Sequence, residues 1–363
     1  MKRSLIVETT ANSCYFRTSV AGDGRKALVQ ITERCNLHCA HCFVSSTREG
    51  LDLSLDDLEA KVLPRLGRAR VERVTLTGGE PFVHPELMRI VRLITRLGMP
   101  VGICTNATQT TDEQISQLAG LGGVHVNVSL DGFRPQSHGR FRGNVASFDL
   151  TVATTRKFAE AGLLQGLLST PNALTEVDEF AALCEFAVDV GAEYVLMNPL
   201  SSFGRGVKSH RKLAADHAKM RAIHEVTEVF RRRGVDLVHI RFPNDDRPLA
   251  GCDAGKLLYV FADGLTAVCP YLVFAARTPE SPHSDSDFLV GNILTDEVAS
   301  ALDAYDLAGT LRMGTNTTCT GCAINSQCGK GCPAAVIARG LSIGELDSEQ
   351  CPQPLLQIGR RTT

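Results

Sequence analysis

The sequence lacks an excess of either charge. Its 363 residues include 38 Lys and Arg against 40 Asp and Glu, and 44% are hydrophobic while 21% are charged. A strongly basic or acidic chain would be drawn toward nucleic acid or membrane surfaces, and this balance gives no such attraction. We therefore expect an ordinary globular chain of two or three structural units, with no nucleic-acid partner.

Long apolar runs are missing as well. No stretch approaches the about 20 apolar residues that a membrane-spanning helix needs. The N-terminal Met1–Val7 is followed by Glu8 and not by the apolar core of a signal peptide. The sequence therefore predicts a cytoplasmic protein with no membrane partner. In that reducing compartment, the 13 cysteines indicate metal or redox chemistry rather than disulfides.

Strand-like and helix-like segments alternate between about residues 27 and 240. The expected strands are 28–31, 71–77, 101–104, 124–130, 163–169, 194–197 and 235–240, and the expected helices are 55–66, 85–97, 111–121, 148–161, 178–190 and 213–233. This order predicts an α/β fold with a parallel sheet and right-handed crossovers, in an open or partial (β/α)6 barrel. A full eight-unit barrel would need more chain.

Three cysteines follow the first expected strand, at Cys35, Cys39 and Cys42. Their close spacing lets one loop present three thiolates to one centre. A structural zinc site takes four protein ligands, whereas a cubane iron–sulfur cluster held by three thiolates leaves one iron open to another ligand. Structural or zinc-binding cysteines remain the alternative interpretation.

Short polar motifs follow the next three strands, at the edge of the sheet where sites of such folds lie. In the Thr77–Pro81 segment, glycines allow the backbone to approach a ligand and Glu80 can accept an ammonium group. Turn chemistry would explain each polar residue taken alone, but their joint order favours a site. The candidate residues are Gly78, Gly79, Glu80, Pro81, Thr105, Asn106, Ser129, Asp131 and Arg142.

The three-cysteine loop with Gly-Gly-Glu-Pro one strand later resembles the radical SAM superfamily. The resemblance implies that Cys35, Cys39 and Cys42 hold a [4Fe–4S] cluster whose open iron binds S-adenosylmethionine (SAM). Reductive cleavage of SAM would then release a 5′-deoxyadenosyl radical. It also implies that the polar residues just given line the SAM pocket, with Glu80 near the amino group of SAM. An electron donor such as flavodoxin or ferredoxin is expected as a partner.

The C-terminal third contains seven further cysteines, whose order and gaps resemble the SPASM domain of radical SAM enzymes. That resemblance implies two auxiliary [4Fe–4S] clusters, three clusters in all. Auxiliary cluster I would take Cys252, Cys269 and Cys332, and auxiliary cluster II would take Cys319, Cys322, Cys328 and Cys351. A zinc ribbon built from the same cysteines is the alternative.

Auxiliary cluster I lacks the fourth cysteine that many relatives carry, because residues 242–251 contain none. Asp246 is a candidate oxygen ligand, although a carboxylate matches this iron less well than a thiolate does. A second interpretation leaves this iron open to substrate or solvent. In a third, Cys14 folds over from the N-terminal segment and supplies the missing thiolate.

The expected organisation has four parts. Residues 1–27 form an N-terminal extension, 28–240 the partial barrel of the radical SAM domain, 241–355 a cysteine-rich α+β SPASM domain, and 356–363 a tail. The short segment before the barrel is expected to leave no room for a separate domain that binds a leader peptide.

The resemblance, which extends over about residues 28–352, names a chemistry but no substrate. Residues 252–270 look most like the mycofactocin type, so the leading hypothesis is oxidative modification or cross-linking of a peptide or peptide-derived substrate. The first alternative is a dehydrogenase or epimerase of a small-molecule natural product of the sugar or aminoglycoside type. An epimerase needs a hydrogen donor, for which Cys104 is the candidate, although Cys104 is also interpretable as a buried filler. A non-catalytic iron–sulfur sensor or electron carrier is the alternative from another class.

Overall fold

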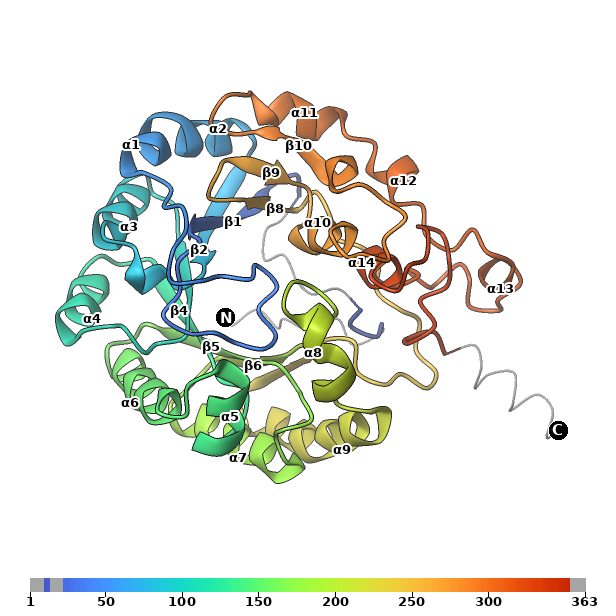
Figure 1. The fold of residues 1–363 in the computed structure, drawn as a ribbon, viewed down its shortest axis with the longest axis horizontal. Helices are drawn as coiled ribbons and strands as arrows, with labels where there is room; N and C mark the ends of the chain where they lie inside the picture. Colours follow the sequence, from blue (N-terminus) through green and yellow to red (C-terminus); the bar gives the residue numbers. More distant parts are fainter. Residues whose placement is uncertain (1–9, 14–21, 353–363) are drawn as a thin grey trace.

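The computed structural model describes residues 10–13 and 22–352. In this part of the chain, ten strands form one curved sheet in the order β10-β9-β8-β1-β2-β3-β4-β5-β6-β7. Strands β1 to β7 pair in parallel, and β7 and β10 lie at opposite ends of the order, so the sheet is not closed (Figure 1). The predicted α/β fold with an open, partial barrel is confirmed.

The seven predicted strands of the barrel are present, with ends that match the prediction or differ from it by at most three residues. They are β1 (Arg25–Thr32), β2 (Val71–Gly78), β3 (Val101–Thr105), β4 (Val124–Ser129), β5 (Leu164–Ser169), β6 (Tyr194–Met197) and β7 (Asp236–His239). Strand β4 shows why the alternation was informative: Val124, Val126 and Val128 are buried in the apolar core, while Asn127 and Ser129 face the inside of the barrel. The sheet therefore has an apolar outer face under the helices and a more polar inner face.

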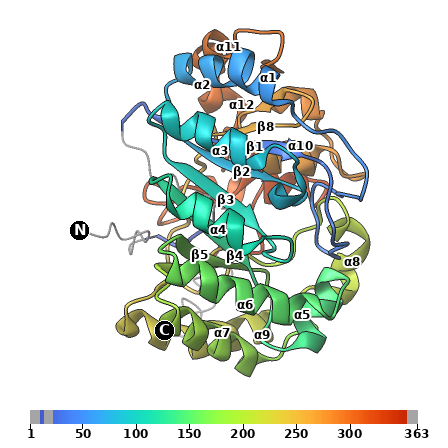
Figure 2. The same ribbon diagram turned by 90° about the vertical axis from the view of Figure 1, so that its left-hand side faces the viewer.

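The crossover helices lie on the outer face of the sheet (Figures 1 and 2). They are α1 (Leu55–Asp57), the π-helical turn η1 (Leu58–Val62) and α2 (Leu63–Arg68), then α3 (Leu87–Arg96), α4 (Asp112–Ala119), α6 (Ser147–Glu160), α7 (Val177–Asp189), α9 (His217–Glu228) and the 3₁₀ turn η3 (Val229–Arg233). The first of them is capped by the Ser54 side chain, which accepts a hydrogen bond from the Asp57 amide.

One long helix over 213–233 was the wrong expectation. The chain instead forms α8 (Gly206–Leu213), leaves the helical conformation, and begins α9 where Asp216 accepts a hydrogen bond from the Lys219 amide. Helix α5 (Pro135–Arg142), which precedes α6, and the 3₁₀ turn η2 (Pro81–Val83) were not expected. These short elements lie at the ends of strands, where apolar periodicity is weak.

The C-terminal third is α+β, as predicted. Strand β8 (Leu257–Val260) pairs in parallel with β1, and β9 (Leu265–Ala267) and β10 (Leu289–Asn292) continue antiparallel. This part extends the barrel sheet on the β1 side. Its helical segments are short: α10 (Pro270–Ala276), η4 (Asp285–Phe288), α11 (Val298–Ala304), α12 (Leu307–Thr310), α13 (Thr317–Thr320) and α14 (Pro333–Ile337). Among the described residues, no helix has both the length and the apolar character that crossing a bilayer requires.

Candidate active site

A cavity of about 820 Å³ lies inside the curved sheet. All three cysteines of the loop over residues 33–46, called the cysteine loop below, line it. Eight of the nine residues predicted for the SAM pocket also line it: Gly78, Gly79, Glu80, Thr105, Asn106, Ser129, Asp131 and Arg142. Pro81 does not, because it begins the buried turn η2. The structure thus brings together residues from four separate strand ends.

The segment after β2 follows the start of the cysteine loop closely. The Gly79 amide donates to the Thr32 carbonyl and the Glu80 amide to the Arg34 carbonyl, each at 2.9 Å. A Cβ atom at Gly79 would lie 2.1 Å from the Arg34 carbonyl oxygen, so only glycine fits there. The Gly-Gly pair therefore joins the two motifs that the sequence places one strand apart.

Glu80 is held by three donors. Its Oε1 accepts from the Phe82 amide at 3.1 Å and from Thr105 Oγ1 at 2.6 Å, and its Oε2 accepts from the Asn106 amide at 2.7 Å. Burial raises the pKa of Glu80 above its ordinary value, and these hydrogen bonds oppose the increase. Both oxygens of the carboxylate are thus held by hydrogen bonds in the cavity wall.

Asp131 and Arg142 bind each other. Asp131 Oδ2 accepts from Arg142 Nε at 2.8 Å, with Arg142 Nη2 also at 2.8 Å, and its Oδ1 accepts from the Thr170 amide at 2.7 Å. Burial alone would raise the pKa of Asp131, but the charges of Arg142 and His41 hold it below its ordinary value. The pair is a buried ion pair that joins β4 to the end of α5.

The remaining polar candidates have local partners. The Asn106 side chain donates to Asn36 Oδ1 at 3.0 Å and accepts from the Thr108 amide at 2.9 Å. It therefore ties the end of β3 to the cysteine loop. Ser129 ends β4 and faces the cavity.

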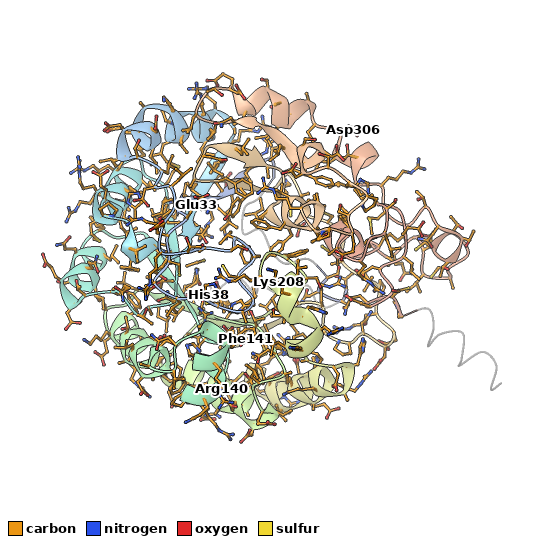
Figure 3. The ribbon with its side chains drawn as sticks, viewed as in Figure 1. Glu33, His38, Arg140, Phe141, Lys208 and Asp306 are labelled. Carbon is orange, nitrogen blue, oxygen red and sulfur yellow. The ribbon has the colours of Figure 1, made fainter. Side chains whose placement is uncertain are left out.

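Segments from α5 and α8 support the cysteine loop, and sequence analysis did not foresee this support. The Ala40 amide donates to the Phe141 carbonyl at 2.8 Å, and the His41 and Phe141 rings stack 4.3 Å apart. Gly143 has a left-handed φ of 77°, and a Cβ there would lie 2.7 Å from the His38 carbonyl oxygen. Figure 3 labels His38, Phe141 and Lys208 close together, from the cysteine loop, α5 and α8.

Arg205, which directly precedes α8, is the main contact of the α8 side. Its Nε donates to the Cys39 carbonyl at 2.8 Å and its Nη1 to the Ser46 carbonyl at 2.7 Å. Its own amide donates to the Cys42 carbonyl at 3.0 Å. Arg205 therefore holds the backbone of the cysteine loop in place, and it also lines the cavity.

The thiols of the cysteine loop are placed where they can bind a metal centre. Burial raises the pKa of Cys35 to about 11 and that of Cys39 to about 12, with the Leu37 amide and Arg142 respectively opposing the increase. Cys39 is buried, Cys35 and Cys42 are partly buried, and all three line one cavity, where a metal centre would take the protons of its thiol ligands. The Leu37 amide already points at Cys35 Sγ at 3.4 Å. This donor set fits an iron–sulfur cluster.

Cys104 lies in the cavity wall and not in the core under the helices. It is on β3, and burial raises its pKa to about 11, with the charge of Lys26 opposing. Lys26, on β1, also lines the cavity, and burial followed by repulsion from Arg73 lowers its pKa to about 8. Lys26 carries no motif that would have identified it from sequence.

The three cysteines predicted for auxiliary cluster I line a second, smaller cavity: Cys252, Cys269 and Cys332. Asp253 lines it with them, whereas Asp246 is not among its lining residues. The Ala254 amide points at Cys252 Sγ at 3.4 Å, and the Cys332 amide donates to Asp347 Oδ2 at 3.3 Å. Cys14, the cysteine candidate for the fourth ligand, lies outside the described residues.

The cysteines predicted for auxiliary cluster II lie in the turns around α13 and before the end of the described chain. Asn316 caps α13 through the Cys319 amide, and its side-chain nitrogen lies 3.4 Å from Cys319 Sγ. The Lys330 amide points at Cys328 Sγ at 3.4 Å, and the Cys351 amide donates to the Asp347 carbonyl. Cys322 follows Cys319 in the same turn, its amide bonded to the Cys319 carbonyl.

Comparison with known proteins agrees with this geometry. Residues 29–187 match the family model of the radical SAM superfamily. Mycofactocin maturase MftC of Mycolicibacterium smegmatis is 28% identical over 88% of this chain and 81% of its own length. The subtilosin biosynthesis protein AlbA of Bacillus subtilis is 28% identical over 77% of this chain and 59% of its own.

Among solved structures, SuiB of Streptococcus suis bound to its precursor peptide SuiA superimposes with a TM-score of 0.72. It is 18% identical and covers 90% of this chain and 75% of its own, so it shows a shared fold. The expectation of a catalytic protein is confirmed, against the alternative of a sensor. Residues 29–187 therefore carry a radical SAM domain, and the chain is an enzyme similar over most of its length to radical SAM maturases.

Proposed function

We propose that this enzyme is a SPASM-type maturase that oxidises or cross-links a peptide or peptide-derived substrate. One observation carries the proposal: a single large cavity has the three-cysteine loop and Glu80 on its wall and leaves room beside them for a substrate side chain. The relatives support the substrate class, since MftC and AlbA are named for mycofactocin maturation and subtilosin biosynthesis and SuiB was solved with a precursor peptide.

The residues of the cavity fit the cofactors of the superfamily. Cys35, Cys39 and Cys42 would hold a [4Fe–4S] cluster, and SAM would lie against Gly79 and Glu80. When bound, these groups supply the 5′-deoxyadenosyl radical that removes a hydrogen atom from the substrate. The chain itself would contribute a preformed carboxylate for the SAM ammonium and a cavity wall that positions the reacting groups.

The two further clusters belong to the same proposal. Cys252, Cys269 and Cys332 would hold auxiliary cluster I, and Cys319, Cys322, Cys328 and Cys351 would hold auxiliary cluster II. The assignment of the first three cysteines to one cluster is supported because all three line the same small cavity. Clusters of this kind suit a net oxidation, because they can accept an electron. A flavodoxin- or ferredoxin-type donor would reduce the first cluster.

Of all the cluster ligands, the fourth ligand of auxiliary cluster I is the one that the sequence determines least. We propose that it is held at most by a replaceable oxygen ligand, Asp246 in the sequence prediction, and that substrate or thiol can reach it. Cys252 is solvent-exposed, which supports access to this cluster from outside. Asp253, in the cavity wall, is the second oxygen candidate.

Epimerisation of a small natural product, one of the two reactions in the first alternative, is the second candidate function, favoured by one observation. Cys104 is a protonated thiol in the wall of the cavity that holds the cysteine loop. A thiol in that position can donate a hydrogen atom to a substrate radical, whereas an oxidation does not require one.

Replacing Glu80 should weaken SAM binding. Glu80→Gln keeps the shape but removes the charge that would pair with the SAM ammonium, and we expect a loss of about 1.5–3 kcal/mol in binding free energy. Isothermal titration of SAM into the anaerobic, cluster-loaded protein measures it. Glu179→Gln is the matched control, since that buried carboxylate bonds Ser137 and the Phe133 amide and does not line the cavity. Equal SAM affinity in wild type and Glu80→Gln would place Glu80 outside the SAM site.

Turnover in deuterated water separates the two candidate functions. Incubation with SAM, a reductant and candidate peptides should give a product lighter by two hydrogens and free of deuterium at the reacting carbon if the enzyme oxidises. Retention of activity by Cys104→Ala is then expected. A product of unchanged composition carrying one deuterium, lost in Cys104→Ala but kept in Cys184→Ala, would instead establish epimerisation. Mass spectrometry reads both outcomes.

A further inference from the structure

Two histidines and a glutamate meet on the outer side of the sheet, away from the cavity. His224 and Glu228 lie one turn apart on α9, and His239 ends β7. One ligand atom from each of the three lies within 4.8 Å of the others. His239 is buried, while the His224 and Glu228 side chains are 37% and 40% exposed, so the cluster opens to solvent on one side.

Thr227 determines which nitrogen of His239 carries the proton. Its hydroxyl donates to the Ile223 carbonyl at 2.7 Å, so its single proton is used. In the tautomer that this arrangement favours, His239 Nε2, which lies 2.9 Å from the same oxygen, is the donor in that contact. His239 Nδ1 is left as an unprotonated nitrogen with its lone pair directed away from Thr227.

That lone pair faces a carboxylate oxygen. His239 Nδ1 lies 3.5 Å from Glu228 Oε2, and His224 Nε2 lies 3.8 Å from the same oxygen. Both His239 Nδ1 and Glu228 Oε2 are buried and make no hydrogen bond with any described residue. Two electron-rich atoms opposed at this distance repel each other unless a cation lies between them.

We propose that His224 Nε2, Glu228 Oε2 and His239 Nδ1 bind a divalent metal ion of the zinc type. Imidazole nitrogens and one carboxylate oxygen are ligands that Zn²⁺ takes at about 2.0–2.2 Å, with water in the remaining position. The hydrogen bond from His239 to Thr227 is the kind of second contact that orients a metal-binding imidazole.

The surroundings favour zinc over hard cations. Arg231 hydrogen-bonds Glu228 Oε1, so the carboxylate has only one oxygen to give and part of its charge is compensated. Mg²⁺ and Ca²⁺ depend on several oxygen ligands, whereas Zn²⁺ draws its affinity here from two imidazoles. The Phe242 ring, 4.6 Å from that of His239, covers the apolar side.

The position in the fold suggests what the ion does. β7 is the last strand of the open sheet, so one of its edges has no neighbouring strand among the described elements. A metal shared by α9 and the end of β7 would fasten that helix to the edge strand. The ion would stabilise the fold, and this role does not depend on the proposed maturase activity.

Zinc binding to the anaerobic, cluster-loaded protein tests this. After incubation with one equivalent of Zn²⁺ and gel filtration, we expect about one zinc per chain, with nitrogen and oxygen neighbours at about 2.0–2.1 Å and no sulfur at about 2.3 Å in X-ray absorption. His224→Gln should weaken zinc binding by more than about 100-fold, and Thr227→Val, which removes only the orienting hydroxyl, by about 10- to 100-fold. Zinc should also raise the thermal midpoint of the wild type.

His217→Gln provides the matched control, since His217 is an exposed histidine at the start of the same helix. It should bind zinc and gain thermal stability as the wild type does. Failure of the wild type to retain zinc, equal retention by His224→Gln, or a sulfur shell would each overturn the proposal, the last by assigning the zinc to cysteines.

Discussion

Protein in which Cys35, Cys39 and Cys42 are all replaced by alanine should retain about eight of about twelve irons and cleave no SAM. The expectation follows from the loop geometry, in which three cysteines line the cavity that also holds Glu80. The auxiliary cysteines are on other segments and line other surfaces, so their clusters should survive the change. Iron and sulfide analysis with a 5′-deoxyadenosine assay measures both effects.

Cys184→Ala is the control for that variant. Cys184 is buried on α7 among apolar side chains and is not among the predicted ligands, so this protein should keep all of its iron and its SAM cleavage. If the triple variant lost all of its iron, the cysteine loop would be required for folding and the assignment of clusters to separate cysteine sets would fail. Wild-type protein containing zinc in place of iron would refute the iron–sulfur assignment altogether.

Arg241→Met should be among the most destabilising single substitutions in the chain. Arg241 donates to both oxygens of Asp347, at 2.6 and 3.0 Å, and both side chains are almost fully buried. Removing the guanidinium leaves a buried charge without compensation, which costs about 3–5 kcal/mol in the free energy of unfolding. Asp347 also accepts from the Cys332 amide, so iron loss from auxiliary cluster I should become faster.

Urea unfolding of the anaerobic, cluster-loaded protein, with iron release followed in parallel, checks this prediction. Arg221→Met is the control, because Arg221 pairs with Asp245 at 2.5 Å but both side chains are about half exposed. Such surface pairs contribute at most about 1 kcal/mol. A midpoint for Arg241→Met within the range of this control would show that the buried pair does not hold the C-terminal segment.

Much of the barrel could be predicted because its strands carry a strong local signal. Val124, Val126 and Val128 alternate with polar residues, and the structure buries the valines while Asn127 and Ser129 face the cavity. The same regularity indicated which strand ends meet, since parallel strands place their carboxyl ends along one edge. The candidate residues at those ends accordingly line one cavity.

The support of the cysteine loop could not be predicted in this way. Arg205 and Phe141 are far from the cysteine loop in the sequence, and they hydrogen-bond backbone carbonyl and amide groups of the loop. Such contacts produce no periodic pattern in the sequence. Helix α8 is a mostly polar segment, so its sequence does not indicate that it supports the cysteine loop. Only the packing of α8 against the loop shows this. Lys26 is likewise one charged residue at the start of an apolar strand, and its position in the cavity depends on the curvature of the whole sheet.

The cysteine ligands of auxiliary cluster I could be predicted, but its fourth ligand could not. The resemblance to the SPASM domain predicted the grouping of Cys252, Cys269 and Cys332, which lie 17 and 63 residues apart along the chain yet line one cavity. The fourth ligand depends instead on which loop approaches that cavity, and sequence spacing contains no information about this. Here Asp253, next to Cys252, enters the wall.

The most direct test of radical chemistry at this site is a single-turnover assay of SAM cleavage. Anaerobic, cluster-loaded protein is mixed with SAM and dithionite without substrate, and 5′-deoxyadenosine and methionine are quantified by mass spectrometry. Both products should appear in equal amounts, and their formation should be abolished in the variant with Cys35, Cys39 and Cys42 replaced. Recovery of intact SAM from wild-type protein whose clusters are fully reduced would contradict the assignment of the cysteine loop and Glu80 to SAM cleavage.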